Sequence, residues 1–154
     1  MQSAMPTLEE TISFIQKAHA GQTDKAGNDY YLHPIAVMNR LPANVDIEVK
    51  LAALLHDVLE DTPYTRQQLS GMGYSKRTLD TVEMVTHKAG DQRTYAEKIG
   101  GIIASANKDA IQVKLADMSE NSDPARLALL DPAKREYLLE KYSAPLRALR
   151  QAAS

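Results

Sequence analysis

Apolar residues recur at steps of three and four positions along almost the whole chain, which is the spacing of one face of an α-helix. Thr7 and Glu10 form a capping-box pattern in front of the first such stretch, and Thr65 and Gln68 repeat the pattern further along. No segment shows a convincing β-strand pattern. The sequence therefore predicts an all-α fold, a single helical bundle of about eight or nine helices.

The expected helix starts follow from residues that favour the first turn. Pro34, Pro124 and Pro132 suit that turn, and Asp46 and Ser75 are suitable N-caps. The predicted helices cover about residues 8–20, 35–41, 47–61, 66–70, 76–85, 94–105 and 109–119, with two more after the last two prolines.

Composition limits the class of protein. With 154 residues, 44% hydrophobic content and a net charge of −2, we expect one domain over residues 1–154, with its core over about 7–150. The Lys and Arg residues are scattered and the chain has one Phe and no Trp, so we expect no binding of nucleic acid. The sequence does not indicate an oligomeric state.

The chain shows no sign of export or of a membrane. No apolar run approaches the roughly 20 residues of a membrane span, and the N-terminus lacks the features of a signal peptide. We therefore expect a cytoplasmic protein. Because there is no cysteine, any metal site must use nitrogen and oxygen ligands.

The segment LAALLHDVLED (residues 51–61) places four titratable side chains in an apolar helical run. Buried imidazole and carboxylate groups need partners, and a divalent metal is the simplest one. His56 and Asp57 would hold the cation, and Glu60 with Asp61, one helical turn later, would lie where water could be polarised. The alternative is a helix end with solvated acids and a satisfied core histidine.

Two distant residues favour the metal interpretation. His33 precedes a proline at a helix start, so its backbone is held rigidly, and Asp117 is a carboxylate within an apolar segment. They are the candidate third and fourth ligands. His19 is interpreted as a packing residue or as a support for a metal ligand, not as a ligand itself, whereas His87 and Arg126 could each either reach the site or serve elsewhere.

These motifs resemble a known family. The resemblance rests on AHAGQ (18–22), HP (33–34), LLHDVLEDT (54–62) and VKLAD (113–117) followed by Asn121. In this order they resemble the HD-domain metal-dependent phosphohydrolases, and closely the hydrolase domain of the RelA/SpoT alarmone enzymes and their small stand-alone relatives. The likeness covers about residues 10–145.

The resemblance implies a specific activity. It implies Mn²⁺ bound by His33, His56, Asp57 and Asp117, with Glu60 and Asp61 orienting or activating the attacking water. The implied substrate is a nucleotide with a 3′-pyrophosphate, such as (p)ppGpp or (p)ppApp, cut to release pyrophosphate. Two imidazoles and two carboxylates also suit Fe²⁺, Co²⁺ or Zn²⁺.

Substrate contacts are expected from Lys25, Lys114 and Asn121. The family usually has Arg-Lys-Ser where this chain has Asp24, Lys25 and Ala26, and an aspartate cannot stack on a base as arginine does. The preference for guanine or adenine is therefore open. Two alternatives are an HD phosphohydrolase of other nucleotides or phosphoesters and a non-catalytic nucleotide-sensing module.

Overall fold

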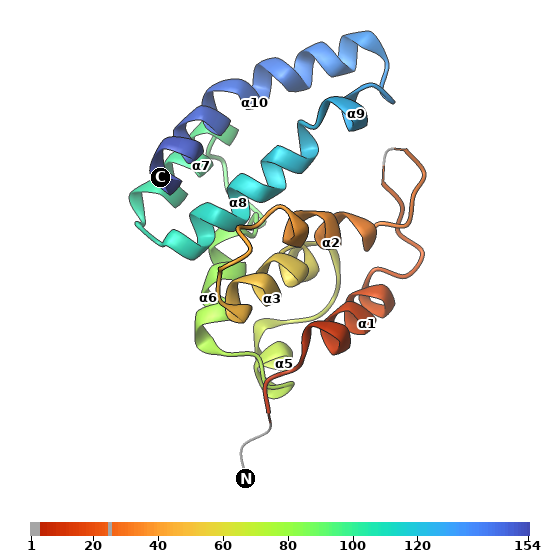
Figure 1. Cartoon of the computed structure of the whole chain (residues 1–154), viewed down its shortest axis with the longest axis vertical. Helices are drawn as coiled ribbons and strands as arrows, with labels where there is room; N and C mark the ends of the chain where they lie inside the picture. Colours follow the sequence, from red (N-terminus) through yellow and green to blue (C-terminus); the bar gives the residue numbers. More distant parts are fainter. Residues whose placement is uncertain (1–3, 25) are drawn as a thin grey trace.

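The computed structural model describes residues 4–24 and 26–154, and within them the chain is helical apart from loops and one isolated β-bridge between Thr23 and Asp29 (Figure 1). The helices are α1 (Leu8–Ala18), α2 (Leu32–Asn39), α3 (Ile47–Leu55), α4 (Val58–Asp61), α5 (Arg66–Gly71), α6 (Lys76–Val85), α7 (Tyr95–Ala104), α8 (Lys108–Asn121), α9 (Pro124–Leu127) and α10 (Pro132–Ala153). The all-α prediction is confirmed, and α4 and α9 are four-residue turns. In the described part of the chain, no helix has the length and apolar character needed to cross a membrane.

The expected caps are mostly confirmed. Thr7 and Thr65 both form complete capping boxes, and the Ser75 side chain accepts from the third residue of its helix. Asp46 precedes α3 as predicted, but its side chain does not cap that helix. Its carboxylate instead accepts a hydrogen bond of 2.7 Å from Arg77.

The predicted helix over residues 47–61 is wrong in one respect, because it is broken between α3 and α4. The Ala53 carbonyl, which would accept from the amide of Asp57 in a continuous helix, lies 2.6 Å from the His56 ring nitrogen Nδ1. The His56 amide also donates to this carbonyl, at 3.4 Å. The break at His56 and Asp57 therefore separates them from the turn that carries Glu60.

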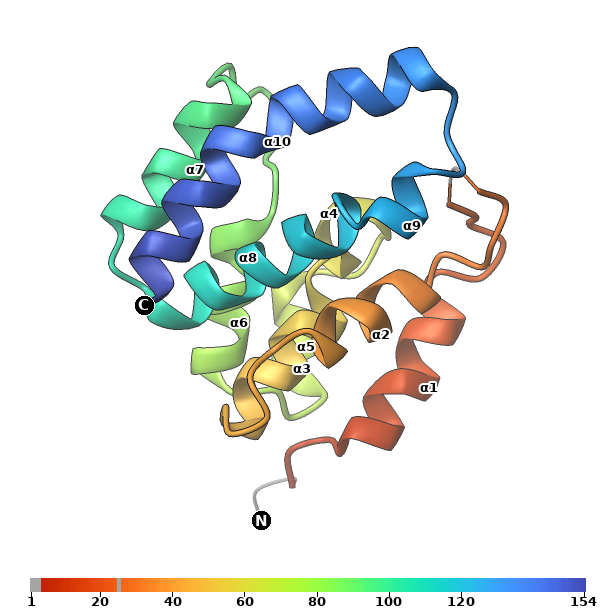
Figure 2. The same ribbon diagram turned by 45° about the horizontal axis from the view of Figure 1, so that its top comes forward.

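Helix α8 lies between α2 and α10, as Figures 1 and 2 show from two directions, and it contributes residues to two apolar clusters. The first cluster centres on α3, whose residues Leu51–Leu55 are fully buried. The second joins α7, α8 and α10, with Met118 and Leu149 fully buried. Because α8 contributes to both clusters, the Asp117 side chain is held on a rigid element.

Replacing Leu54 tests the importance of α3 in the core. Leu54→Ala should lower the free energy of unfolding by about 3 kcal/mol, because it removes buried methyl groups and leaves a cavity. Urea denaturation followed by circular dichroism would measure the change. Leu139, 48% exposed on α10, is the control, and Leu139→Ala should change stability by less than about 0.5 kcal/mol. Equal losses for both variants would contradict this account of the core.

Candidate metal centre and its cavity

Three separate elements bring two imidazoles and a carboxylate together. His33 lies in the first turn of α2, His56 at the break after α3, and Asp117 on α8, and all three are buried. His33 Nε2 lies 2.9 Å from Asp117 Oδ1, and His56 Nε2 lies 3.5 Å from the same oxygen. The donor atoms of the three residues all lie within 4.8 Å of one another, so one cation could contact all of them.

Asp57 joins this group through His56. Its Oδ2 lies 3.0 Å from His56 Nε2 and accepts a 2.7 Å hydrogen bond from the hydroxyl of Tyr30. No role for Tyr30 is predicted from the sequence alone. Its position three residues before His33, in the loop that enters α2, was the available signal.

The donor set fits a divalent cation. The Nδ1–H of His56 points to the Ala53 carbonyl, which leaves a lone pair on Nε2 facing the oxygens of Asp57 and Asp117. A lone pair opposite carboxylate oxygens needs a proton or a metal ion between them. Burial by itself lowers the pKa of His56, but the Asp57 and Asp117 carboxylates outweigh it and raise this pKa well above its ordinary value. The centre therefore favours positive charge.

Lys114 and Asn121 both contact Asp117 from the same helix. Lys114 Nζ lies 3.4 Å from Asp117 Oδ2, and the Asn121 amide donates to Oδ1 at 3.2 Å. Burial alone raises the pKa of Asp117, but the Lys114 charge and hydrogen bonds from the two histidines hold it well below its usual range. Lys25, the third predicted substrate contact, lies outside the described residues.

Glu60 and Asp61 have different surroundings. Glu60 is exposed, and its Oε1 accepts a 2.7 Å hydrogen bond from the backbone amide of His87. For Asp61 it is the backbone carbonyl that is held, by the Gln22 side chain at 2.9 Å. Burial, together with the charges of Asp57 and Glu60, raises the pKa of Asp61.

His19 is buried, in line with a packing residue, and it also makes a polar contact. Its Nδ1 lies 2.9 Å from Oε1 of Gln22, and the amide of Gln22 donates to the Asp61 carbonyl. Gly21 has a φ of +83°, a left-handed conformation that favours glycine and lets the chain turn back after α1. The end of α1 is thus tied to the end of α4.

One cavity of about 890 Å³ contains the centre. Its wall includes Tyr30, Glu60 and Lys114 together with the two histidines and two aspartates of the centre. Asp61 is not one of the described residues that form this wall. The arrangement offers a cation-binding cluster, an exposed carboxylate and an ammonium group to a single ligand.

The sequence and the fold have relatives among known proteins. The bifunctional (p)ppGpp synthase/hydrolase SpoT of Escherichia coli K12 is 36% identical over an alignment of 148 positions, and the match covers 88% of this chain and 21% of SpoT. The guanosine-3′,5′-bis(diphosphate) 3′-pyrophosphohydrolase of Haemophilus influenzae is 34% identical over an alignment of 137 positions, and the match covers 80% of this chain and 19% of that enzyme. The chain is thus similar in sequence to enzymes of the RelA/SpoT type. It spans about a fifth of the length of these curated relatives.

A solved structure has the same fold as this chain. The structure is described as a metazoan orthologue of SpoT that hydrolyses ppGpp, and it superposes with a TM-score of 0.72 at 23% sequence identity. The match covers 98% of this chain and 94% of the other. No protein-family model matches the chain.

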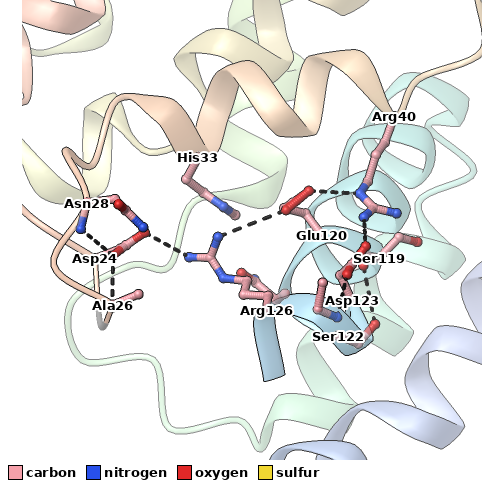
Figure 3. A network of polar contacts seen from close by, with 12 residues as sticks. Asp24, Ala26, Asn28, His33, Arg40, Ser119, Glu120, Ser122, Asp123 and Arg126 are labelled. Atoms are coloured by element: carbon pink, nitrogen blue, oxygen red, sulfur yellow. Dashed lines mark hydrogen bonds and ion pairs between the residues drawn. The ribbon is translucent and has the colours of Figure 1, made fainter. Parts of the chain in front are cut away.

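On the side of α9, the cavity is walled by a network of charged residues (Figure 3). Asp24 Oδ1 accepts hydrogen bonds of 2.9 Å from the amides of Ala26 and Asn28. The Arg126 guanidinium lies between carboxylates, 3.7 Å from Asp24 Oδ2 and 4.0 Å from Glu120 Oε2. From the sequence, Arg126 could either reach the site or pair with an acid. In the structure it lines the cavity and also lies close to two carboxylates.

Proposed function

We propose that this protein is a metal-dependent hydrolase that removes the 3′-pyrophosphate from purine nucleotides such as (p)ppGpp or (p)ppApp and releases pyrophosphate. The observation that carries the proposal is the buried cluster of His33, His56 and Asp117, which shares one cavity with Glu60. The printed names of the bacterial relatives, 3′-pyrophosphohydrolases of a guanosine bis(diphosphate), support the same substrate class. Such a role gives the protein a small-molecule nucleotide as its partner and a place in the cytoplasm.

We propose Mn²⁺ as the metal, held by His33, His56, Asp57 and Asp117, with Fe²⁺, Co²⁺ or Zn²⁺ as chemically acceptable replacements. When bound, a divalent cation lowers the pKa of water and neutralises charge that develops on phosphoryl oxygens. Tyr30 keeps Asp57 oriented through its 2.7 Å hydrogen bond, and α8 keeps Asp117 in place.

In the proposed reaction, Glu60 accepts a proton from the attacking water. The water oxygen forms a bond to the phosphorus next to the ribose, and the bond from that phosphorus to the 3′ oxygen breaks. The 3′ oxygen takes up a proton as pyrophosphate leaves, so the sum is one water consumed for each bond cut. We expect Lys114, a cation in the cavity wall, to bind phosphoryl oxygens, and Asn121, which lines the same cavity, to contact the nucleoside.

A panel of nucleotides tests the proposal. The protein would be incubated with guanosine and adenosine nucleotides, each with and without a 3′-pyrophosphate, in the presence of Mn²⁺ and after chelation of metal. We expect pyrophosphate release only from the 3′-pyrophosphorylated nucleotides and only with metal. Release of phosphate or triphosphate from 5′-nucleotides would favour the broader HD phosphohydrolase activity instead. Turnover that survives complete metal removal would contradict the proposal.

A further inference from the structure

Arg126 differs from the other cavity-facing charges in how it is bound. In the part of the chain that the structure describes, its guanidinium makes no hydrogen bond, and its nearest carboxylate oxygens are 3.7 and 4.0 Å away. Arg40, by contrast, donates to Glu120 at 2.9 Å and also contacts Asp123. The Arg126 side chain is 31% exposed and lines the cavity. Its planar group of N–H donors is therefore available to a ligand.

The acids beside Arg126 are fixed by other bonds. Asp24 accepts from two backbone amides of its own loop, and Glu120 is held by Arg40. Asp123 in turn accepts from the amide of Ala125 at 2.8 Å. These carboxylates are held in place without Arg126, and their negative charge keeps the Arg126 guanidinium at the cavity wall. The side chain therefore loses little conformational freedom when a ligand binds.

The charge balance of the cavity indicates which part of a nucleotide meets Arg126. Six carboxylates line the described cavity wall, and three of them, Asp24, Glu120 and Asp123, lie on the Arg126 side. Arg126 therefore provides no net positive field for a phosphate. The phosphates are better served by the metal cluster and by Lys114. Leu129 and Leu130, directly after α9, add apolar surface to the Arg126 side, which suits a neutral planar ring.

We propose that Arg126 contacts the purine base of the bound nucleotide and is a specificity-determining residue of this protein. A guanidinium stacks on aromatic rings and also donates to the N7 acceptor of purines and to the O6 acceptor of guanine. The neighbouring Asp24 and Glu120 carboxylates accept from the N–H groups of a base. This inference rests on the proposed function, because that function places the 3′-pyrophosphate at the metal cluster.

Equilibrium binding tests the inference separately from turnover. Guanosine 5′-diphosphate, adenosine 5′-diphosphate and inorganic pyrophosphate would be titrated into the Mn²⁺-loaded wild-type protein and into Arg126→Gln. We expect Arg126→Gln to weaken binding of at least one nucleotide by about tenfold and to leave pyrophosphate binding within twofold. Arg126→Lys keeps the charge but loses the planar group, so it should remain impaired. Arg150→Gln, at an exposed position in the last turn of α10, is the control and should bind like wild type.

Each result decides between defined outcomes. Unchanged nucleotide binding in Arg126→Gln, or no nucleotide binding by the wild type, would overturn the inference. An equal loss for pyrophosphate would also overturn it, since Arg126 would then be a phosphate contact. Wild-type turnover of 3′-pyrophosphorylated nucleotides is measured in parallel. If turnover is absent but binding depends on Arg126, the proposed activity fails while the base contact stands. Thermal unfolding of each variant confirms that the fold is kept.

Discussion

Asp117→Asn should abolish both metal binding and hydrolysis, with a fall in kcat of at least about a thousandfold. Asp117 is the carboxylate that both histidines share, at 2.9 and 3.5 Å, and an amide is a much poorer ligand for a divalent cation. The residue is buried on α8, so no neighbouring side chain can readily take its place. Turnover of a 3′-pyrophosphorylated nucleotide and calorimetric titration with Mn²⁺ would measure the two losses.

Metal binding can also be followed without any substrate. A cation that binds only the folded protein stabilises it by about 2.7 kcal/mol at a hundred times its Kd, so Mn²⁺ should raise the Tm of the wild type by roughly 5–10 °C. Asp117→Asn should show no such rise. Asp109→Asn is the matched control on the same helix, because Asp109 pairs with Arg77 away from the centre. A normal Mn²⁺ response in Asp117→Asn would show that the cluster is not the metal site.

Much of the centre could be predicted from sequence because its residues conflict with their local surroundings. Polar groups in apolar helical segments marked His56, Asp57 and Asp117, and the proline after His33 marked a rigid backbone. The packing of α2, α3 and α8 brings His33, His56 and Asp117 close together, and their role as metal ligands stays a prediction. The break at His56 could not be predicted, because it depends on a side chain competing for the Ala53 carbonyl.

The surroundings of Arg126 were beyond sequence reasoning for a different reason. Its two nearest acids come from a loop 102 positions earlier, at Asp24, and from the preceding helix, at Glu120. Only the path of the chain between them brings the three groups to one wall (Figure 3). A pairing between distant residues cannot be predicted from the local sequence pattern. A charged residue within an apolar helical segment can be recognised from that pattern.

Glu60→Gln should lower kcat by about a hundredfold or more, which is the usual effect of removing a general base. The variant is close to isosteric, and its side-chain oxygen can still accept from the His87 amide, so the loop and the cavity wall should keep their shape. KM and the Mn²⁺ affinity should therefore change by less than about threefold, since the metal cluster is intact. Steady-state kinetics with the 3′-pyrophosphorylated nucleotide would separate kcat from KM.

Asp61→Asn is the informative comparison, because the two acids are adjacent in sequence but not equivalent in the structure. Glu60 lines the cavity, whereas Asp61 is absent from the described wall and is anchored through its backbone carbonyl by Gln22. We therefore expect a smaller loss of kcat in Asp61→Asn than in Glu60→Gln. A larger loss in Asp61→Asn, with Mn²⁺ affinity preserved, would assign the attacking water to Asp61. It would also mean that the Asp61 carboxylate turns into the cavity when the nucleotide binds.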